Sequence, residues 1–392
     1  MTDSSDTTIY LDNAATSFPK PDCVYAAADT YMRSMGIAFG RGSHAGATDA
    51  ARLVAQCRQR VARILDAESG DRVAFTFNCT DGLNLLLRGV LRKGDRVVTS
   101  TLEHNSVLRP LQQLKSEFQL DVVYVDFDAQ TGLIDTKSFV HELNSQPTRL
   151  VVLNHASNVT GIVQPVETIS AATHETGALL MLDAAQTVGH IPFSVRALKI
   201  DMLASAGHKG LLGPLGTGIV YIRDGLENEV LPIRCGGTGT DSESPLQPIT
   251  MPTKFESGNL NMPGLAGLNA AAEWILQQSV ANLHQRILKL STQLSQALRE
   301  IRGVAVFGGV EAQNVGIVSF SLNGMDSQDV AAVLDQSFQI RCRAGLHCAP
   351  LVHKTLGTIP AGGTVRLSPG PLTAQADVTA AAEAVAQLAA SL

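Results

Sequence analysis

The sequence predicts an α/β protein with a large domain around a mostly parallel central sheet and a smaller α+β domain at its C-terminal end. Two observations carry this prediction. Between residues 72 and 223, short apolar runs alternate with helix-like segments, the order of a parallel sheet covered by helices. After Pro263 this alternation gives way to a long helical pattern. We therefore divide the chain into a large domain, residues 18–262, and a small domain, residues 263–392 together with residues 1–17.

Seven apolar segments are expected to form the buried strands of the large domain. They are rich in Val, Leu and Ile and are bounded by Gly, Asp or Asn. In chain order they read RVAFTFN, RVVTST, DVVYVDFD, RLVVLNHAS, ALLMLDAAQ, DMLASAG and GIVYIR. The segments that suit helices between them are TDGLNLLLRGVL, NSVLRPLQQLKSEF, DTKSFVHEL and PVETISAATHETG. In such sheets, ligands bind outside the carboxyl ends of the strands.

The C-terminal third follows a polar stretch rich in Gly and Pro, RCGGTGTDSESPLQPITMPTK, which we expect to be a long functional loop. One long helical pattern then covers LAGLNAAAEWILQQSVANLHQRILKLSTQLSQALREI and leads into the apolar segment NVGIVSFSL. The remaining expected elements are a helix around DSQDVAAVLDQ, a strand in GTVRLSPG and a final helix in ADVTAAAEAVAQLAASL.

Composition narrows the class of protein. The net charge of −6 and the pI near 5.9 argue against a nucleic-acid partner. The N-terminal MTDSSDTTIY does not resemble a secretory signal, and no apolar run is long enough for a membrane helix. The six cysteines are scattered without a CxxC, so we expect reduced thiols in a cytoplasmic protein.

Lys209 lies in AGHKGLLGPLGTG, a glycine-rich turn between two expected strands. A Walker phosphate loop needs Ser or Thr directly after the lysine, and Gly210 stands there instead. The GxGxxG dinucleotide pattern is also absent. Two interpretations stay open: a surface lysine in a turn, or a lysine that forms a Schiff base with a carbonyl cofactor.

Two strand ends offer further polar candidates. Asp183 ends the apolar run LMLD, where a carboxylate is unfavourable unless it is paired. It either caps the next helix or keeps the pyridine nitrogen of pyridoxal phosphate protonated. In TFNCTDGLN, Cys79 and Thr80 stand between a strand and a helix. That turn is either a plain N-cap or a phosphate site at a helix N-terminus.

His104 and Arg366 each allow a structural and a functional interpretation. His104, in TSTLEHNSVLRP, is either a packed or solvated histidine or an acid–base group stacked on a cofactor ring. Arg366, in GTVRLSPG, makes either a surface ion pair or a bidentate contact with a substrate carboxylate.

The stretch RCRAGLHCAP, residues 341–350, allows three interpretations. Cys342, His347, Cys348 and His353 could ligate zinc, although their spacing matches no common zinc site. Cys342 and Cys348 could form a redox pair. The third interpretation is a loop with one reactive thiol.

In this order, the stretches resemble the class V aminotransferase family of pyridoxal-phosphate enzymes and, within it, the cysteine desulfurases. The resemblance runs from residue 9 to near residue 370 and rests on LDNAAT, GRGSHAGA, EHNSVLRPL, HASNVTG, LDAAQ, GHKGLLGP and RAGLHCAP. It implies fold type I, the aspartate-aminotransferase-like fold, with pyridoxal 5′-phosphate as the cofactor and no metal. It also implies a homodimer in which residues 41–44 lie near the partner's active site.

The resemblance also implies roles for individual residues. Lys209 would carry the cofactor, Asp183 would pair with its pyridine nitrogen, and Gln186 would bond its phenolic oxygen. His104 would stack on the ring and Cys348 would be the nucleophile. Thr80 and His208 would contact the phosphate, and Cys79, Ser205 and Asn259 are further candidates for binding the cofactor. Those implied at the substrate are Asn158, Arg366, Ala14 and His44.

Two positions depart from the family pattern near the phosphate. Ala206 stands where the family commonly has Ser or Thr, and Ser205 comes one residue earlier. In GNLN, Asn259 replaces a residue of the segment that reaches the partner's phosphate. We therefore expect the phosphate site to be rewired rather than absent.

The resulting hypothesis is conversion of L-cysteine to L-alanine with a persulfide on Cys348. His104, rather than the adjacent His347, is the expected proton carrier, because neighbouring side chains in an extended loop point apart. The short RAGLHC loop resembles desulfurases that work with a sulfur acceptor protein, and selenocysteine is a further candidate substrate. The alternatives are an aminotransferase, a C–S lyase that does not use Cys348, or a non-catalytic cofactor-binding protein.

Overall fold

The structure, a computed structural model, describes residues 8–40, 44–239, 243–309 and 313–392. Within these residues the larger sheet has seven strands, at the seven segments predicted from the sequence. Their spatial order is β2 (Val73–Thr76), β8 (Gly218–Ile222), β7 (Met202–Ala206), β6 (Leu179–Asp183), β5 (Leu150–Asn154), β3 (Arg96–Ser100) and β4 (Asp121–Val125). The pairs from β4 to β7 are parallel, and β8 runs antiparallel to both β7 and β2.

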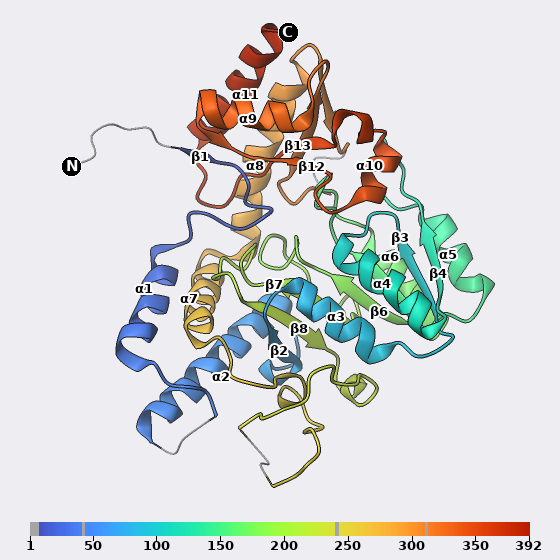
Figure 1. Cartoon of the computed structure of the whole chain (residues 1–392), viewed down its shortest axis with the longest axis vertical. Helices are drawn as coiled ribbons and strands as arrows, with labels where there is room; N and C mark the ends of the chain where they lie inside the picture. The colour runs from blue at the N-terminus through green and yellow to red at the C-terminus, as the bar shows by residue number, and fades with distance from the viewer. Residues whose placement is uncertain (1–7, 41–43, 240–242, 310–312) are drawn as a thin grey trace.

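Helices cover both faces of this sheet, which explains why strands such as β5 and β6 are buried along their whole length. Alternate residues of one strand enter different clusters, because Leu180 packs on one face and Leu179 on the other. Helices α3 (Cys79–Val90) and α4 (Asn105–Phe118) cover one face. The other face is covered by α2 (Ala45–Leu65), α5 (Thr136–Ser145), α6 (Val166–Glu175) and α7 (Met262–Gln278) (Figure 1).

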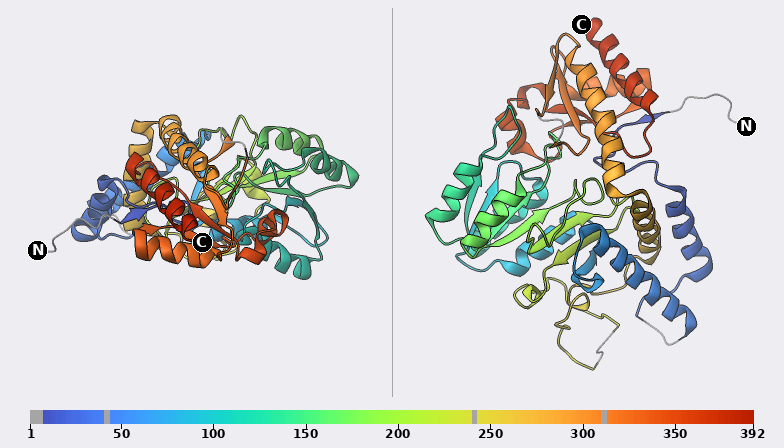
Figure 2. Two further views of the ribbon diagram at one scale, coloured as in Figure 1. Left: turned by 90° about the horizontal axis from the view of Figure 1, so that it is seen from above. Right: turned by 180° about the vertical axis from the view of Figure 1, so that it is seen from behind.

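The C-terminal part contains an antiparallel sheet with the order β12 (Arg343–Gly345), β13 (Thr364–Leu367), β10 (Val318–Leu322), β9 (Val304–Phe307). It packs with α8 (Val280–Arg299), α9 (Ser327–Phe338) and α11 (Gln375–Ala390) around a separate core. Leu11 joins this core, and β1 (Ile9–Tyr10) pairs with β11 (Ile340–Arg341). Residues 9–11 therefore pack with the C-terminal part of the chain, as Figure 2 shows from two sides.

The long helix expected over residues 265–301 is two helices. Ser279 has a left-handed φ of 68° and separates α7 from α8. Helix α7 packs in the core of the larger sheet and against α1 (Asp22–Thr30), whereas α8 packs with the C-terminal sheet. The domain division at residue 263 stays a prediction, and this packing favours a boundary at Ser279.

Short elements complete the chain. They are the π-helix η1 (Tyr31–Met35), the 3-10 helices η2 (Gly70–Arg72), η3 (Leu226–Asn228), η4 (Thr253–Phe255) and η6 (Ile359–Ala361), and the α-helix α10 (Pro350–Leu356). The described residues of the expected loop 234–254 contain, besides the start of η4, no helix or strand, and residues 240–242 lie outside the described part. Among the described helices none has the length and apolar character needed to cross a membrane.

Candidate active site

A cavity of about 220 Å³ opens at the carboxyl ends of the large sheet's strands. Strands β5, β6 and β7 end there at Asn154, Asp183 and Ala206, and helix α3 begins there. Parallel strands bring residues far apart in the chain to one edge of the sheet, where α/β proteins bind ligands. The full lining is Asn78, Cys79, Thr80, His104, Ser106, Asn154, Asn158, Asp183, Ala185, Gln186, Ala206, His208 and Lys209.

Lys209 enters this cavity from the glycine-rich turn after β7. The turn is closed by a backbone hydrogen bond from Gly213 N to Gly207 O, 2.7 Å long. A side chain at Gly210 would place its Cβ 2.4 Å from the Val188 carbonyl oxygen, so only glycine fits beside the lysine. Burial lowers the pKa of Lys209, while Cys79 and Asp183 act in the opposite direction. The lysine is therefore no ordinary surface residue.

Asp183 is held at the end of β6 with one oxygen engaged by the protein. Its Oδ1 accepts hydrogen bonds from Ala185 N, at 3.0 Å, and from Cys79 Sγ, at 3.5 Å. Burial raises its pKa, and Lys209 lowers it in part. Gln186 donates from Nε2 to the Ala14 carbonyl oxygen at 3.0 Å, and its Oε1 is buried without a partner.

His104 caps helix α4 and belongs to a hydroxyl network. Ser106 Oγ lies 2.7 Å from Thr80 Oγ1 and 2.8 Å from His104 Nδ1. Burial, with the charges of Lys209 and nearby arginines, lowers the pKa of His104 to about 3, so the ring is neutral. Because Ser106 N donates to Nδ1, the neutral ring carries its proton on Nε2. His104 can therefore donate a proton from the Nε2 side.

His208 lies next to Lys209 in the cavity lining. Its carbonyl oxygen accepts from Ser17 N at 3.0 Å, which ties the N-terminal segment to this wall. Burial and the charge of Lys209 lower the pKa of His208 to about 4. Its Nδ1 is buried and has no partner.

Arg366 joins the two parts of the chain behind the cavity. It is 1% exposed, donates from Nη1 to the Asn158 carbonyl oxygen at 3.1 Å, and pairs from Nη2 with Asp12 at 2.7 Å. The exposed ion pair considered from sequence is therefore wrong, since this arginine is buried. Its Nε and the Oδ1 of Asn158 have no partner. Ala14, whose carbonyl oxygen Gln186 binds, is 4% exposed on the same side.

The Cys348 loop reaches the cavity from the small domain. Asn105 N, next to His104, donates to the Cys348 carbonyl oxygen at 2.7 Å, and Asn158 Nδ2 donates to the His347 carbonyl oxygen at 2.6 Å. The expected extended loop is a turn, because His347 and Cys348 have φ values of 47° and 60°. Their side chains still diverge: His347 is buried against Thr364, whereas Cys348 is exposed.

Six of the expected site residues are not among those that line this cavity: Cys348, Arg366 and Ala14, described above, and Ser205, Asn259 and His44. Ser205, contrary to expectation, faces away and donates to the Ala184 carbonyl oxygen at 3.0 Å, because alternate residues of a strand point to opposite faces. Asn259 lines a separate hollow beside Gly216 and Arg234. His44 caps the exposed start of α2, and residues 41–43 next to it lie outside the described part of the chain.

The metal and redox interpretations of RCRAGLHCAP find no support in the geometry. Among the described residues, no group of three or more His, Cys, Asp or Glu side chains could hold a metal ion. All six cysteines are free thiols. Cys342 packs against the core of the small domain, and burial raises its pKa to about 12. The loop thus presents one exposed thiol.

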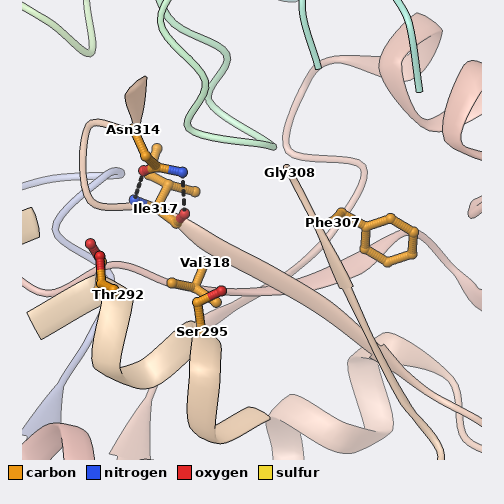
Figure 3. Close-up of a pocket in the computed structure, with 8 residues that line it drawn as sticks. Thr292, Ser295, Phe307, Gly308, Asn314, Ile317 and Val318 are labelled. Carbon is orange, nitrogen blue, oxygen red and sulfur yellow. Dashed lines mark hydrogen bonds between the residues drawn. The ribbon is translucent and has the colours of Figure 1, made fainter. Parts of the chain in front are cut away.

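A second hollow, of about 20 Å³, lies between α8 and strands β9 and β10 (Figure 3). The side-chain amide of Asn314 already has hydrogen-bond partners within the protein: its Oδ1 accepts from the N–H of Ile317, and its Nδ2 donates to the carbonyl oxygen of Ile317. The lining contains hydroxyl, amide and apolar groups but no ionisable side chain. This hollow lacks the groups that catalysis would need.

Sequence reasoning missed several polar residues of the site. Ser106, Asn78 and Asn154 line the cavity, and Glu103 is buried behind it, accepting from Asn154 N at 2.9 Å. A signal was present for Ser106, because a hydroxyl two residues after a capping histidine can bond that histidine. Nothing local in the sequence marks Glu103 as buried: Ser100 donates to its Oε1 at 2.9 Å, but its other donor, Asn154 N, comes from a strand that is distant along the chain.

Comparison with known proteins decides the family. The aminotransferase class-V family model matches residues 9–380. The chain belongs to the aminotransferase class-V family. A probable cysteine desulfurase of Methanothermobacter thermautotrophicus is 37% identical over 364 residues, 92% of this chain and 89% of that protein. A cysteine desulfurase of Escherichia coli O157:H7 is 30% identical and covers 87% of this chain and 84% of its own.

Solved structures confirm the predicted fold of this class-V family member. The apo structure of a cysteine desulfurase from Thermococcus onnurineus superimposes with a TM-score of 0.91 at 31% identity, covering 98% of this chain and 95% of that one. A cysteine desulfurase from Escherichia coli gives a TM-score of 0.88 at 28% identity, with 99% and 96% coverage. The chain therefore has the fold of the pyridoxal-phosphate-dependent cysteine desulfurases.

Proposed function

We propose that this protein is a pyridoxal-phosphate-dependent cysteine desulfurase, which converts L-cysteine to L-alanine and keeps the sulfur as a persulfide on Cys348. The observation that carries the proposal is the hydrogen bond from Asn105 N to the Cys348 carbonyl oxygen. It fixes the backbone of the Cys348 loop to the residue that follows His104, and His104 lines the cavity with Lys209 and Asp183. An aminotransferase needs no thiol there, and the relatives named cysteine desulfurase support the same function.

The cavity fits pyridoxal phosphate by its chemistry. Buried polar atoms without partners belong to three lining residues: Oε1 of Gln186, Oδ1 of Asn158 and Nδ1 of His208. Such atoms are costly unless a ligand or water satisfies them. Lys209 offers an amine and Asp183 a carboxylate, and the start of α3 with Thr80 offers a phosphate site. When bound, the cofactor withdraws electrons from the reacting carbon of the substrate.

The side chains of this chain would then divide the remaining work. Lys209, whose pKa burial lowers, can accept the proton from the substrate Cα. Arg366 and Asn158 would hold the substrate carboxylate, with Ala14 nearby, and His44 would act at the other subunit's site. Neutral His104 would move a proton at the substrate sulfur from its Nε2 side.

Cys348 would be the nucleophile that accepts the sulfur. Its sulfur forms a bond to the substrate sulfur while the substrate's C–S bond breaks, and that electron pair stays with the carbon that becomes the methyl group of alanine. One cysteine and one enzyme thiol give one alanine and one enzyme persulfide. No further oxidant or reductant is consumed in this half of the reaction.

Replacing Cys348 with alanine tests the proposal. Cys348→Ala is expected to lose alanine formation from L-cysteine, whereas Cys342→Ala, a second cysteine of the same stretch that packs in the core, should retain it. Alanine is measured with a thiol reductant present as the sulfur acceptor. Unchanged alanine formation by Cys348→Ala would favour a lyase or an aminotransferase. A yellow protein that forms neither alanine nor sulfide would favour a non-catalytic role.

Several finer properties remain proposals of the same function. We infer a homodimer in which residues 41–44 and Asn259 of one subunit approach the other subunit's site. L-selenocysteine is a second proposed substrate, and a sulfur acceptor protein a proposed partner. A cytoplasmic location stays a prediction from the sequence.

A further inference from the structure

A charged side chain contacts the exposed thiol, and the sequence assigns it no role. Arg343, the first residue of β12, donates from Nη2 to Cys348 Sγ at 3.5 Å. We propose that Arg343 is a catalytic residue that holds the Cys348 sulfur in its anionic form, first as the thiolate and then as the persulfide. This inference rests on the proposed function and adds a residue to it.

The pairing of β12 with β13 shows why Arg343 needs an anionic partner. Arg343 lies directly opposite Arg366 in the antiparallel register, and opposite residues of such a pair share one face of the sheet. Two like charges in this position are destabilising. Asp12 neutralises Arg366, but among the ion pairs of the described residues Arg343 has no carboxylate partner. The sulfur of Cys348 lies where a carboxylate partner of Arg343 would otherwise be needed.

The histidines near the thiol cannot supply the same charge. Burial and nearby arginines lower the pKa of His104 to about 3 and that of His347 to about 2, so both rings are neutral. An arginine guanidinium, unlike an imidazole, is a permanently charged group. A guanidinium beside a thiol favours the thiolate, the form that acts as a nucleophile.

The contact is held in place from both sides. Arg343 comes from a strand, and the Cys348 backbone is fixed by Asn105 while Asn158 fixes the carbonyl of His347. Donors held in advance at a developing charge stabilise it without having to reorganise. Once sulfur has been transferred, the negative charge moves to the terminal sulfur of the persulfide, one bond further from Cys348. The long arginine side chain can follow it to the surface, where an acceptor collects the sulfur.

The first experiment measures the thiol without requiring turnover. Arg343→Gln and Arg343→Lys are compared with Arg341→Gln, an exposed arginine two residues away whose side chain is 60% exposed. Holoenzyme is treated with iodoacetamide, and each cysteine is followed by peptide mass spectrometry. Arg343→Gln should slow alkylation of Cys348 roughly tenfold, the scale of one charge-assisted hydrogen bond. Arg343→Lys should restore part of the rate, because it retains the charge.

Internal controls separate this effect from misfolding. Cys23 and Cys235 are also exposed thiols, and their alkylation should be the same in every variant. Free guanidinium ion added to Arg343→Ala should recover part of the Cys348 rate. Equal alkylation of Cys348 in Arg343→Gln and the unmodified protein would overturn the proposal.

The second experiment follows one turnover. Without reductant, each site should release one alanine and stop as the persulfide. Arg343→Gln should lower the rate of this single turnover by the same factor as the rate of alkylation. The KM for cysteine, obtained from the rates at several cysteine concentrations, should be unchanged. A rise in KM alone would overturn the proposal and place Arg343 at the substrate carboxylate. If the unmodified protein forms no alanine, the proposed function fails, whereas the alkylation experiment still tests the contact between Arg343 and the thiol.

Discussion

The two parts of the candidate site differ in their exposure to solvent. Asp183 is 4% exposed at the strand ends of the large domain, whereas Cys348 of the small domain is an exposed thiol on a left-handed turn. Burial shifts the pKa of both Lys209 and Asp183, and Arg343 lies beside the thiol. The contrast indicates a division of labour. Chemistry at carbon is favoured where water is excluded, and a sulfur that must be passed on has to be reached from outside.

Replacing Lys209 should separate the two regions most strongly. Lys209→Ala removes the group proposed to carry the cofactor and to accept the Cα proton, so alanine formation should fall by at least about a thousandfold. Alkylation of Cys348 should be unchanged, because the loop is anchored by Asn105 and Asn158. Lys93→Ala, at an exposed lysine between α3 and β3, is the matched control. Substantial alanine formation by Lys209→Ala would contradict the role of the lysine.

Replacing Asp183 sharpens the same contrast within the buried region. Asp183→Asn keeps the shape and removes the charge, which should reduce alanine formation roughly a hundredfold. The absorption spectrum of the bound cofactor should shift as well, while Cys348 should react with iodoacetamide as before. Asp71→Asn, at an exposed carboxylate, should change neither reading. An unaltered spectrum would show that Asp183 does not touch the cofactor.

Glu103 tests the buried region through pH. Burial and the charge of Asp183 raise its pKa from 4.5 to about 8, so it is protonated in the folded protein and ionised in the unfolded chain between these values. Folding then takes up a proton, and stability falls as pH rises through this window. Glu103→Gln cannot ionise. Between pH 5 and pH 8 it should abolish the decrease of a few kcal/mol in the free energy of unfolding, measured by urea denaturation at each pH. Glu175→Gln, an exposed control, should keep this decrease.

Replacing His347, which supports the exposed Cys348 turn, should have the smallest effect of these substitutions. Its buried Nε2 bonds the carbonyl oxygen and hydroxyl of Thr364 and so fixes the turn that presents Cys348. His347→Ala should loosen this turn and slow single-turnover alanine formation roughly five- to tenfold. Exchange of the substrate Cα proton in deuterated water should continue, because it depends on Lys209. His141→Ala is the control, and equal losses in both readings would refute a role confined to the loop.

The fold was predictable because its signals are local. Each of the seven strands is a short apolar run, and the alternation with helices follows from covering both faces of a parallel sheet. The long helix was predicted wrongly because Ser279 interrupts a pattern whose apolar spacing continues on both sides. A left-handed serine has no marker in sequence, and only the packing of α7 and α8 into different cores reveals the break.

The chemical groups of the site could also be predicted, because a strand end with a carboxylate and a glycine-rich turn with a lysine are unusual in sequence. The contacts between these groups could not be predicted. Ala206, and not Ser205, lines the cavity because successive residues of a strand point to opposite faces. Arg343 contacts Cys348, five residues further along the chain, across the left-handed turn at His347 and Cys348. By itself, the sequence determined the set of strands and the residues able to carry the chemistry. Tertiary structure alone decided burial, and with it the pKa shifts of Lys209, Asp183 and His104. The reason is that burial and charge depend on neighbours that are distant along the chain.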